Sequence, residues 1–289
     1  MSTLKNSFAP FDAPLASAFE ASIEAALTED IGSADVTGRL VPENEWVKAR
    51  VVVREEAVLC GAPWFEGVMI RLNGGIRIDW CYAEGAIMAA NSEVCGIHAP
   101  ARALFTAERS ALNFLQLLSA VATSTRECVE LIKGTCAQIL DNRKTLPGLR
   151  LAQKYAVRVG GGKNHRLGLY DGILIKENHI AVAGGITAAL RTAQALNAGV
   201  PIQIEVKNLQ QLDEALAAGA ASVLLDNFSL EAMRAAVRTT AGRALLEASG
   251  GVTREGVRAI ADTGVDRISI GSLTKDVRAT DYSLRIVGE

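Results

Sequence analysis

Cationic and imidazole side chains gather in one stretch of a chain whose overall charge is close to neutral. Residues 160–179, GGGKNHRLGLYDGILIKENH, hold two of the three histidines of the 289-residue chain. Between residues 143 and 176 there are eight lysines and arginines against one acid, Asp171, although the formal net charge is only -2. Arginine forks match carboxylates and phosphates through paired hydrogen bonds. The pattern predicts a site for small, strongly anionic molecules.

Polar residues and glycines follow a series of short apolar runs in the second half of the chain. If these runs are parallel strands of a β/α barrel, their carboxyl ends converge on one mouth, where such barrels carry out chemistry. The residues at these ends are Asn142, Arg143, Lys144, Lys176, Glu205, Asp226, Ser249, Gly250, Gly251, Gly271 and Ser272. We expect a mouth with cations on one side, two carboxylates on the other and small-residue loops after the last strands.

Two features of this mouth suggest particular ligands. Glu205 and Asp226 could bind Mg²⁺, accept hydrogen bonds from sugar hydroxyls or stabilise a positive charge that develops on a reacting carbon. Salt bridges to neighbouring lysines are the structural alternative. The loops at 249–251 and 271–272 would expose backbone N–H groups before a helix, which favours phosphate binding. Tight turns without a ligand are the alternative for these glycines.

Several cationic and imidazole side chains have more than one reasonable role. Arg143 and Arg166, beside the glycines and His165, are candidates for holding carboxylates or phosphates. Lys176 leaves the apolar run GILI, which suits either a Schiff-base lysine or a charge partner for a substrate carboxylate. His179 either caps a loop or fills a core position, or takes part in catalysis.

Alternating apolar runs and amphipathic segments predict repeated β/α units behind these residues. The expected strands lie at 137–141, 171–176, 202–206, 222–226, 244–249 and 267–271. Helices between them end at glycines, and Ser229 is expected to cap one of them. Units of this length favour a TIM-like barrel, complete or incomplete, with a doubly wound sheet as the alternative. No G-x-G-x-x-G follows the first strand, which disfavours a dinucleotide-binding sheet.

The first hundred residues follow a different pattern. A helix is expected around 15–27, and the three segments after it alternate between apolar and polar residues like antiparallel strands. A long segment with an apolar stripe, from residue 103 to about 132, then joins this α+β region to the barrel.

The composition is that of an ordinary globular protein. Hydrophobic residues make up 49% of the chain, and a pI near 6.0 argues against general affinity for nucleic acid. No apolar run approaches the ~20 residues that cross a bilayer, and the first residues lack a secretory apolar block. We therefore expect a cytoplasmic protein. Five cysteines at irregular spacing, without a C-x-x-C pair, predict reduced and mostly buried thiols.

Seven motifs, in order along nearly the whole chain, resemble the quinolinate phosphoribosyltransferase family. They are EDIGSADVT (29–37), ERSALNFLQLLSAVAT (108–123), NRKTLPGLR (142–150), KYAVRVGGGKNHRLGLYDGILIKENH (154–179), LLDNFS (224–229), EASGGV (247–252) and SIGSLT (269–274). The resemblance implies an α/β fold with an N-terminal α/β sandwich domain and a C-terminal incomplete TIM-like α/β barrel. We expect the limits 1–121 and 122–289, with the last ~15 residues returning to the N-terminal domain.

The resemblance also implies a reaction. Members of the family transfer 5-phosphoribose from phosphoribosyl pyrophosphate to the ring nitrogen of quinolinate, with loss of CO₂ and pyrophosphate, which gives nicotinate mononucleotide for NAD biosynthesis. They need Mg²⁺, and they form homodimers, with possible higher oligomers, in which one subunit's N-terminal domain covers its partner's barrel. Neither nucleic acid nor a membrane is an expected partner.

Roles for individual residues follow from the matched motifs. The residues that would hold quinolinate are Arg143, His165, Arg166, Lys176 and, from the partner subunit, Arg109. Lys144, Glu205 and Asp226 would be catalytic and face phosphoribosyl pyrophosphate, with the two carboxylates as possible Mg²⁺ ligands. The residues that would hold phosphate are Ser249, Gly250, Gly251, Gly271 and Ser272.

Three positions depart from the family pattern. Asn142 replaces a usual threonine, Gln203 replaces the first glutamate of an E-V-E pattern, and Lys275 stands where some bacterial members have histidine. These changes affect the expected ribose and phosphate contacts.

Three rival functions fit parts of the sequence. The nearest is a related phosphoribosyltransferase with another acceptor, either nicotinate or the substrate of molybdenum-linked homologues. The others are a Schiff-base aldolase built on Lys176 and a polyanion binder that uses the basic segment.

Overall fold

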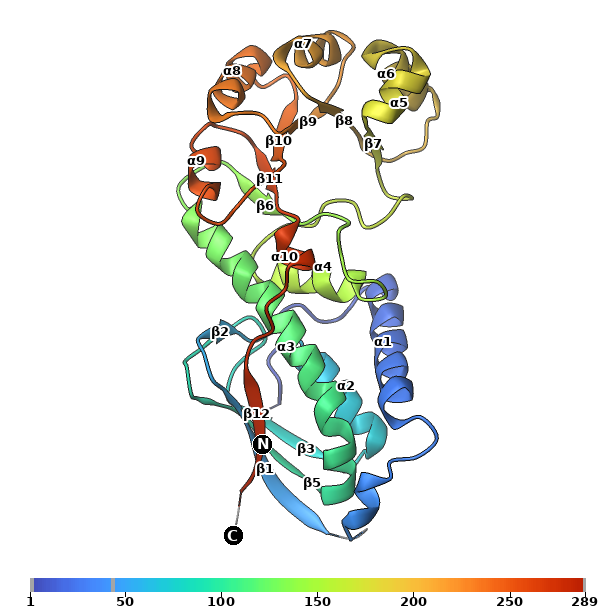
Figure 1. The fold of residues 1–289 in the computed structure, drawn as a ribbon, viewed down its shortest axis with the longest axis vertical. Coiled ribbons are helices and arrows are strands. Elements are labelled where there is room, and N and C mark those ends of the chain that lie inside the picture. The colour runs from blue at the N-terminus through green and yellow to red at the C-terminus, as the bar shows by residue number, and fades with distance from the viewer. Residues whose placement is uncertain (1–2, 43–44, 288–289) are drawn as a thin grey trace. The chain divides into compact units, whose positions relative to one another are not determined.

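The structure, a computed structural model, describes residues 3–42 and 45–287 (Figure 1). The chain folds into two compact units. Unit 1 comprises residues up to 126, residues 146–161 and residues from 276 onward, and unit 2 comprises residues 127–145 and 162–275. The units are therefore interleaved, whereas the predicted limits were 1–121 and 122–289, with the last ~15 residues returning to the N-terminal domain. Residues from 276 onward group with unit 1 because their strand pairs there.

Unit 1 is built on an antiparallel sheet with the strand order β12-β1-β5-β3. The strands of this unit are β1 (Trp46–Val53), β2 (Ala57–Val58), β3 (Arg77–Trp80), β4 (Ile87–Met88), β5 (Glu93–Pro100) and β12 (Tyr282–Val287). β2 and β4 form a separate two-stranded ladder. Along β5, Cys95, Ile97 and Ala99 are buried in the core while Gly96 and His98 between them are more exposed, as expected for a sheet with one covered face.

The helices of unit 1 include two that the sequence patterns did not predict. They are α1 (Ala13–Ile31), the 3₁₀ helix η1 (Thr37–Leu40), α2 (Ala62–Leu72), α3 (Ala101–Leu131) and α4 (Arg150–Val159), with the end of α3 in unit 2. α1 begins at Asp12, whose carboxylate accepts the N–H of Leu15 at 2.9 Å. α2 was missed because it is apolar and buried on more than one face, which weakens its amphipathic period. α4 was missed because its cations were assigned to the basic segment.

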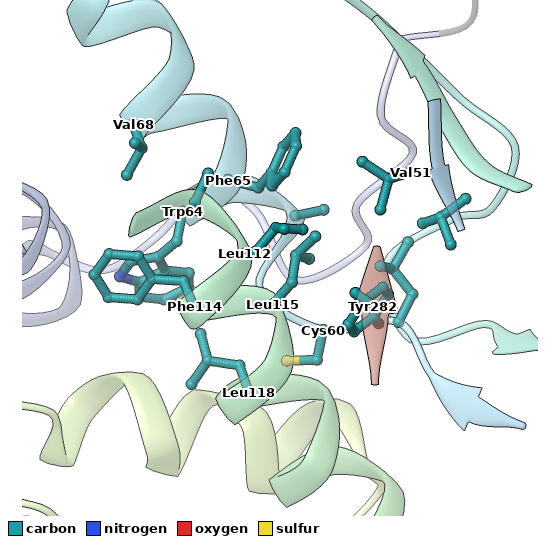
Figure 2. Close-up of a cluster of buried hydrophobic side chains, with 14 of the residues drawn as sticks. Val51, Cys60, Trp64, Phe65, Val68, Leu112, Phe114, Leu115, Leu118 and Tyr282 are labelled. Atoms are coloured by element: carbon teal, nitrogen blue, oxygen red, sulfur yellow. The ribbon is translucent and has the colours of Figure 1, made fainter. Parts of the chain in front are cut away.

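The core of unit 1 lies where α2, α3 and the sheet meet. Figure 2 shows Trp64 and Phe65 of α2 packed near Leu115 of α3, and all three are fully buried. Tyr282 of β12 reaches the same cluster, where its hydroxyl lies 2.8 Å from Ser119 Oγ. The last strand of the chain is thereby anchored to α3 by a buried hydrogen bond.

A buried carboxylate connects three segments of unit 1. Glu84 accepts the N–H groups of Gly61 and Ala62, at 2.8 and 3.2 Å, and the hydroxyl of Tyr155, at 3.0 Å. Burial raises the pKa of Glu84 from 4.5 to about 7, although these hydrogen bonds act in the opposite direction.

Unit 2 is built on six parallel strands in the order β6-β11-β10-β9-β8-β7. The strands are β6 (Gln138–Leu140), β7 (Ile173–Ile175), β8 (Ile202–Val206), β9 (Ser222–Asp226), β10 (Leu245–Ser249) and β11 (Arg267–Ser269). β6 and β7 are the edge strands. A bridge between Leu140 and Lys163 adds the segment after α4 to the β6 edge. The parallel sheet of β/α units predicted from the sequence is confirmed.

Helices cover one face of this sheet, and Figure 1 shows α6 to α9 along the outside of the arc formed by the strands. The helices of unit 2 are α5 (Glu177–Ala183), α6 (Ile186–Ala195), α7 (Leu209–Ala217), α8 (Leu230–Thr240), α9 (Val257–Ala261) and α10 (Ser272–Lys275). Ser229 caps α8 as predicted, because its hydroxyl accepts the N–H of Ala232. The sequence analysis did not predict α5, the short helix that precedes α6.

Two further predictions concerned the cysteines and membrane-spanning segments. All five cysteines are free, and Cys60, Cys95 and Cys128 are buried. Among the described residues, no helix has the length and apolar character needed to span a membrane.

Candidate active site

The predicted strand-end residues gather at one edge of the parallel sheet of unit 2. Glu205 is the fourth residue of the five-residue β8, Asp226 ends β9, and Ser249 ends β10 opposite Asp226 in the ladder. Arg143 follows β6, and Lys176 follows β7 directly. Parallel strands place their carboxyl ends at the same edge, so these side chains share one region.

Alternation along each strand decides which side chains face away from the helices. Ile204 and Val206 of β8 are buried in the cluster that includes the outer helices. Gln203 and Glu205 therefore face the inner side of the sheet. The same period puts Glu247 and Ser249 of β10 on the inner side, because Leu246 and Ala248 belong to the outer cluster.

Two pairs of opposite charges lie at the carboxyl edge. Lys176 Nζ is 3.6 Å from Glu205 Oε2, and Lys207 pairs with Glu177. The ion pair with Glu177 raises the pKa of Lys207, and the negative charges of Asp226 and Glu205 raise it further. Glu205 and Asp226 therefore both lie near Lys207, a residue that the sequence analysis did not select. A small pocket of ≈ 190 Å³ at this edge is lined by Glu205, Lys207 and Glu177 among others.

Two arginines of the predicted anion site are neighbours. Burial lowers the pKa of Arg166, the positive charge of Arg143 lowers it further, and Asp171 acts in the opposite direction. Arg166 Nη1 also donates to the carbonyl of Gly172 at 2.9 Å. Two neighbouring guanidinium groups repel each other. Such a pair is suited to share an anion, which offsets the repulsion.

His165 is turned toward the interior of unit 2. Its Nδ1 accepts the N–H of Arg166 at 2.8 Å, and its Nε2 lies 3.0 Å from Gln203 Oε1. Gln203 Nε2 in turn donates to Glu247 Oε2 at 3.0 Å. The backbone N–H of His165 donates to Asp141, which is fully buried. Protein groups thus engage both ring nitrogens, and the predicted role of His165 in holding a substrate carboxylate stays a prediction.

Glu247 and Asp141 were not selected from the sequence. The sequence does point to Glu247, because it is an acid inside the apolar run ALLEAS and lies on the same face of the strand as Ser249. Asp141 follows directly on a strand and was passed over for the cations after it. Lys207 directly follows β8, as Lys176 follows β7, and was passed over for Glu205 just before it.

His179 takes the capping role that was one of its two predicted alternatives. Its Nδ1 accepts the N–H of Lys176 at 3.0 Å at the start of α5. The backbone that carries Lys176 is thereby fixed next to the carboxyl edge.

The loop after β10 needs both of its glycines. Gly250 has φ +99°, and a Cβ there would lie 2.2 Å from Asn227 Oδ1. Gly251 has φ +59° with open space around it. α9 begins only at Val257, so the helix dipole expected behind this loop is absent, and a bound phosphate would have to use the N–H groups of the loop itself. α10 begins at Ser272 but has four residues.

The loop after β6 is held by its own side chains. Asn142 Oδ1 accepts the N–H of Lys144 at 2.8 Å, and Thr274 Oγ1 donates to the carbonyl of Lys144 at 2.9 Å. A Cβ on Gly271 would lie 2.8 Å from Asn142 Nδ2. Glycine at 271 therefore lets the two loops approach, and asparagine at 142 fits this arrangement.

A larger cavity lies toward the opposite edge of the sheet. It measures ≈ 650 Å³ and is lined by the first residues of several strands as well as by His165, Arg166 and Gln203. The predicted site residues are therefore divided between the carboxyl edge and this inner cavity. They do not all line a single mouth as predicted.

Not every cation of the basic segment belongs to unit 2. Arg150, Lys154 and Arg158 lie on α4 in unit 1, and Lys154 is 1% exposed. Arg109, predicted to serve the site of a partner subunit, is an exposed residue of α3 in unit 1. The cations of the segment that remain in unit 2 are Arg143, Lys144, Lys163, Arg166 and Lys176.

Comparison with known families accounts for both parts of the chain. Residues 35–119 match the N-terminal domain of quinolinate phosphoribosyl transferase, and residues 121–285 match its C-terminal domain. The chain belongs to the quinolinate phosphoribosyltransferase family. The family predicted from the sequence motifs is thereby confirmed.

Relatives within the quinolinate phosphoribosyltransferase family cover most of the chain. A Bacillus subtilis protein named probable nicotinate-nucleotide pyrophosphorylase (carboxylating) is 40% identical over 259 residues, 89% of this chain and 90% of that protein. Its Mycobacterium leprae counterpart is 42% identical over 270 residues, 91% of this chain and 95% of that protein. The solved structure of the nicotinate-nucleotide pyrophosphorylase from Francisella tularensis has a TM-score of 0.91 and 43% identity, and covers 96% of this chain and 98% of its own.

Proposed function

We propose that the chain transfers 5-phosphoribose from phosphoribosyl pyrophosphate to the ring nitrogen of quinolinate, with release of CO₂ and pyrophosphate and formation of nicotinate mononucleotide. The observation that carries the proposal is that Arg143 lies near enough to Arg166 for their charges to interact, in a unit whose carboxyl sheet edge carries Glu205 and Asp226. Family membership supports it, because relatives named nicotinate-nucleotide pyrophosphorylase (carboxylating) share 40% and 42% identity with this chain.

The acceptor is a dicarboxylate in this proposal. Two neighbouring guanidiniums repel each other, and Arg166 is partly withdrawn from water. A molecule with two carboxylates offers each arginine a charge-assisted partner, whereas a mono-acid such as nicotinate leaves one of them without one. Lys176, which follows β7 at the same sheet, supplies a further positive charge when it leaves Glu205.

The donor occupies the carboxyl edge in this proposal. Lys144 faces its phosphates, and the loops with Gly250, Gly251 and Gly271 offer backbone N–H groups. Ser249 and Ser272 add hydroxyls beside these glycines. Positive charge develops on the ribose carbon as pyrophosphate leaves, and Glu205 and Asp226 stabilise it.

The carboxylates at this edge fit a metal that arrives with its substrate. No group of three or more His, Cys, Asp or Glu side chains suited to a metal occurs in the described part of the chain. Mg²⁺ typically uses one or two protein carboxylates together with water and substrate phosphates. Glu205 and Asp226 match that requirement, and the bound ion would neutralise the leaving pyrophosphate.

Loss of CO₂ needs an electron sink rather than a covalent nucleophile. Ribosylation makes the pyridine nitrogen positive, which stabilises the electron pair left on the adjacent ring carbon when its carboxylate departs as CO₂. A proton from solvent then takes the place of the carboxylate on that carbon. The side chain of Lys176 is 52% exposed and paired with Glu205. A charge-partner role for Lys176 is therefore favoured over the Schiff-base alternative.

A second subunit is part of the proposal. Arg109 is exposed on α3 in unit 1. We assign it to the quinolinate site of a partner in a homodimer, as the family resemblance implies.

Release of pyrophosphate tests the proposal directly. The purified protein with Mg²⁺ and phosphoribosyl pyrophosphate is given quinolinate or nicotinate at equal concentration. Pyrophosphate and CO₂ are expected with quinolinate in equal amounts, with far less pyrophosphate from nicotinate. Equal turnover of both acceptors would instead favour the related transferase.

A further inference from the structure

A directed chain of hydrogen bonds runs from the interior of unit 2 to the backbone of Arg166. Glu247 Oε2 accepts from Gln203 Nε2 at 3.0 Å, and Gln203 Oε1 lies 3.0 Å from His165 Nε2. His165 Nδ1 then accepts the backbone N–H of Arg166 at 2.8 Å. The chain links strands β10 and β8 to the loop before β7.

The two ends of this chain determine every proton between them. A carboxylate only accepts, so the amide of Gln203 presents its NH₂ to Glu247 and its oxygen to His165. A backbone N–H only donates, so Nδ1 of His165 carries no proton. His165 Nε2 must then carry the ring proton in order to donate to Gln203. One neutral tautomer satisfies all of these partners.

An imidazolium would not fit the same geometry. A second ring proton on Nδ1 would face the N–H of Arg166 at a heavy-atom distance of 2.8 Å. The charged groups facing His165 are Asp141, which accepts its backbone N–H, Arg166, and Glu247, whose Oε2 is 3.6 Å from Nε2. The amide of Gln203 lies closer to Nε2 than that carboxylate does, so the ring donates to a neutral partner.

Burial makes the chain costly to break. The side chains of Glu247 and His165 are 1% and 14% exposed, and Gln203 is 7% exposed. Glu247 Oε1 has no hydrogen-bond partner among the residues that the structure describes, so the amide of Gln203 is the principal polar contact of this carboxylate there. A buried carboxylate that lost this contact would be left without compensation.

We propose that Glu247 and Gln203 are positioning residues that hold His165 as the neutral, Nε2-protonated tautomer, so that His165 fixes Arg166 and carries no charge to the acceptor. Arg166 is then held at two points, by His165 at its backbone and by the carbonyl of Gly172 at its guanidinium. The role toward the acceptor rests on the proposed function, whereas the tautomer does not.

The tautomer is read from ¹⁵N chemical shifts of the imidazole rings in the whole protein without substrate. The chain has three histidines, and the signals lost in His165→Gln identify the ring of interest. At neutral pH we expect an unprotonated Nδ1 and a protonated Nε2. An imidazolium, or a proton on Nδ1, would overturn the proposal.

Three variants distinguish a positioning role of Gln203 and Glu247 from a role in packing alone. Gln203→Leu removes both hydrogen bonds of the amide and is expected to give a mixture of tautomers and a KM for quinolinate raised roughly fivefold to tenfold. Glu247→Gln keeps an acceptor for Gln203 and is expected to preserve the tautomer and most of the KM. Gln203→Glu cannot donate to Glu247, and is expected to shift His165 toward the imidazolium and to raise the same KM.

Gln138→Leu is the matched control. Gln138 lines the same cavity, and no hydrogen bond of its side chain is present in the described residues. It should change neither the ring signals nor the KM for quinolinate. The KM for phosphoribosyl pyrophosphate should stay constant in all variants. An unchanged tautomer or an unchanged KM for quinolinate in both Gln203 variants would overturn the positioning role. Failure of the wild type to use quinolinate would instead overturn the proposed function, and the tautomer measurement would still stand.

Discussion

Arg143 and Arg166 lie close enough for the charge of one to affect the other. Burial is the larger cause of the lowered pKa of Arg166, and the positive charge of Arg143 adds to it. In a site built for stability alone, such a pair of like charges is unfavourable. The pair is explained if a dianionic molecule binds between the two guanidiniums.

Replacement of Arg143 by alanine tests this relationship. We expect Arg143→Ala to lower kcat/KM for quinolinate by roughly two orders of magnitude, because a charge-assisted partner of one carboxylate is lost. The melting temperature is measured alongside, and a folded variant with low activity is the expected result. Arg191→Ala, which removes an exposed cation from the outer helix α6, is the control and should retain wild-type kinetics. Full activity in Arg143→Ala would contradict the assignment.

Glu84 predicts a pH dependence for the stability of unit 1. Because burial raises its pKa from 4.5 to about 7, only the folded protein keeps this proton between those two values. The stabilisation of the folded state by this proton is complete below pH 4.5 and declines as the pH rises through this window. It amounts to about 3 kcal/mol over the whole range. Glu84→Gln should therefore have a flatter free energy of unfolding between pH 4.5 and 7 in urea titrations.

The control for Glu84→Gln is Glu24→Gln, at an exposed residue. Its free energy of unfolding should vary with pH as that of the wild type does. Glu84→Gln is also expected to be less stable at pH 5, because an amide offers only one acceptor to the N–H groups of Gly61 and Ala62. Parallel profiles for Glu84→Gln and the wild type would rule out a raised pKa in the folded state.

The parts of the fold that repeat locally were predictable from the sequence. β8 and β9 have the predicted limits, 202–206 and 222–226, because a β-branched or leucine-rich run, a polar end and a capped helix are all encoded within about 25 residues. α4 was not predictable in this way. Its cations were assigned to the basic segment, whereas Lys154 is buried in unit 1 through long-range packing.

The same contrast applies to the candidate site. Strand parity located Glu205, Asp226 and Ser249 correctly at one edge of the sheet. It also put Gln203 on the inner side, but the partners of Gln203 are His165 and Glu247, which come from segments far apart in the sequence. Hydrogen bonds of this kind depend on the register between strands, and local pattern does not specify it.

The loop after β10 offers a test in which two adjacent glycines should behave differently. Gly250→Ala meets both a positive φ and a clash with Asn227 Oδ1, whereas Gly251→Ala meets only the positive φ. We expect a loss of about 1–3 kcal/mol for Gly251→Ala from backbone strain and a larger loss for Gly250→Ala. If the loop holds phosphate, the KM for phosphoribosyl pyrophosphate rises in both.

Asn227→Gly combined with Gly250→Ala separates the clash from the backbone strain. Removal of the Asn227 side chain should restore the stability of Gly250→Ala to about that of Gly251→Ala. Thermal unfolding of the four proteins provides the measurement. Equal destabilisation by Gly250→Ala and Gly251→Ala would show that the clash at residue 250 is relieved by movement of the loop.

Lys176 distinguishes charge pairing from covalent catalysis. Its amino group is 3.6 Å from Glu205 Oε2 and its side chain is half exposed, a setting unlike the desolvated pocket of a Schiff-base lysine. Lys176→Arg keeps the charge and should retain measurable pyrophosphate release, with a raised KM for quinolinate, whereas Lys176→Met should lose most of its turnover. Borohydride treatment during turnover should leave the mass of the wild-type protein unchanged. A substrate adduct trapped on Lys176, together with complete inactivity of Lys176→Arg, would instead establish the Schiff-base mechanism, because arginine carries the charge but cannot form the imine.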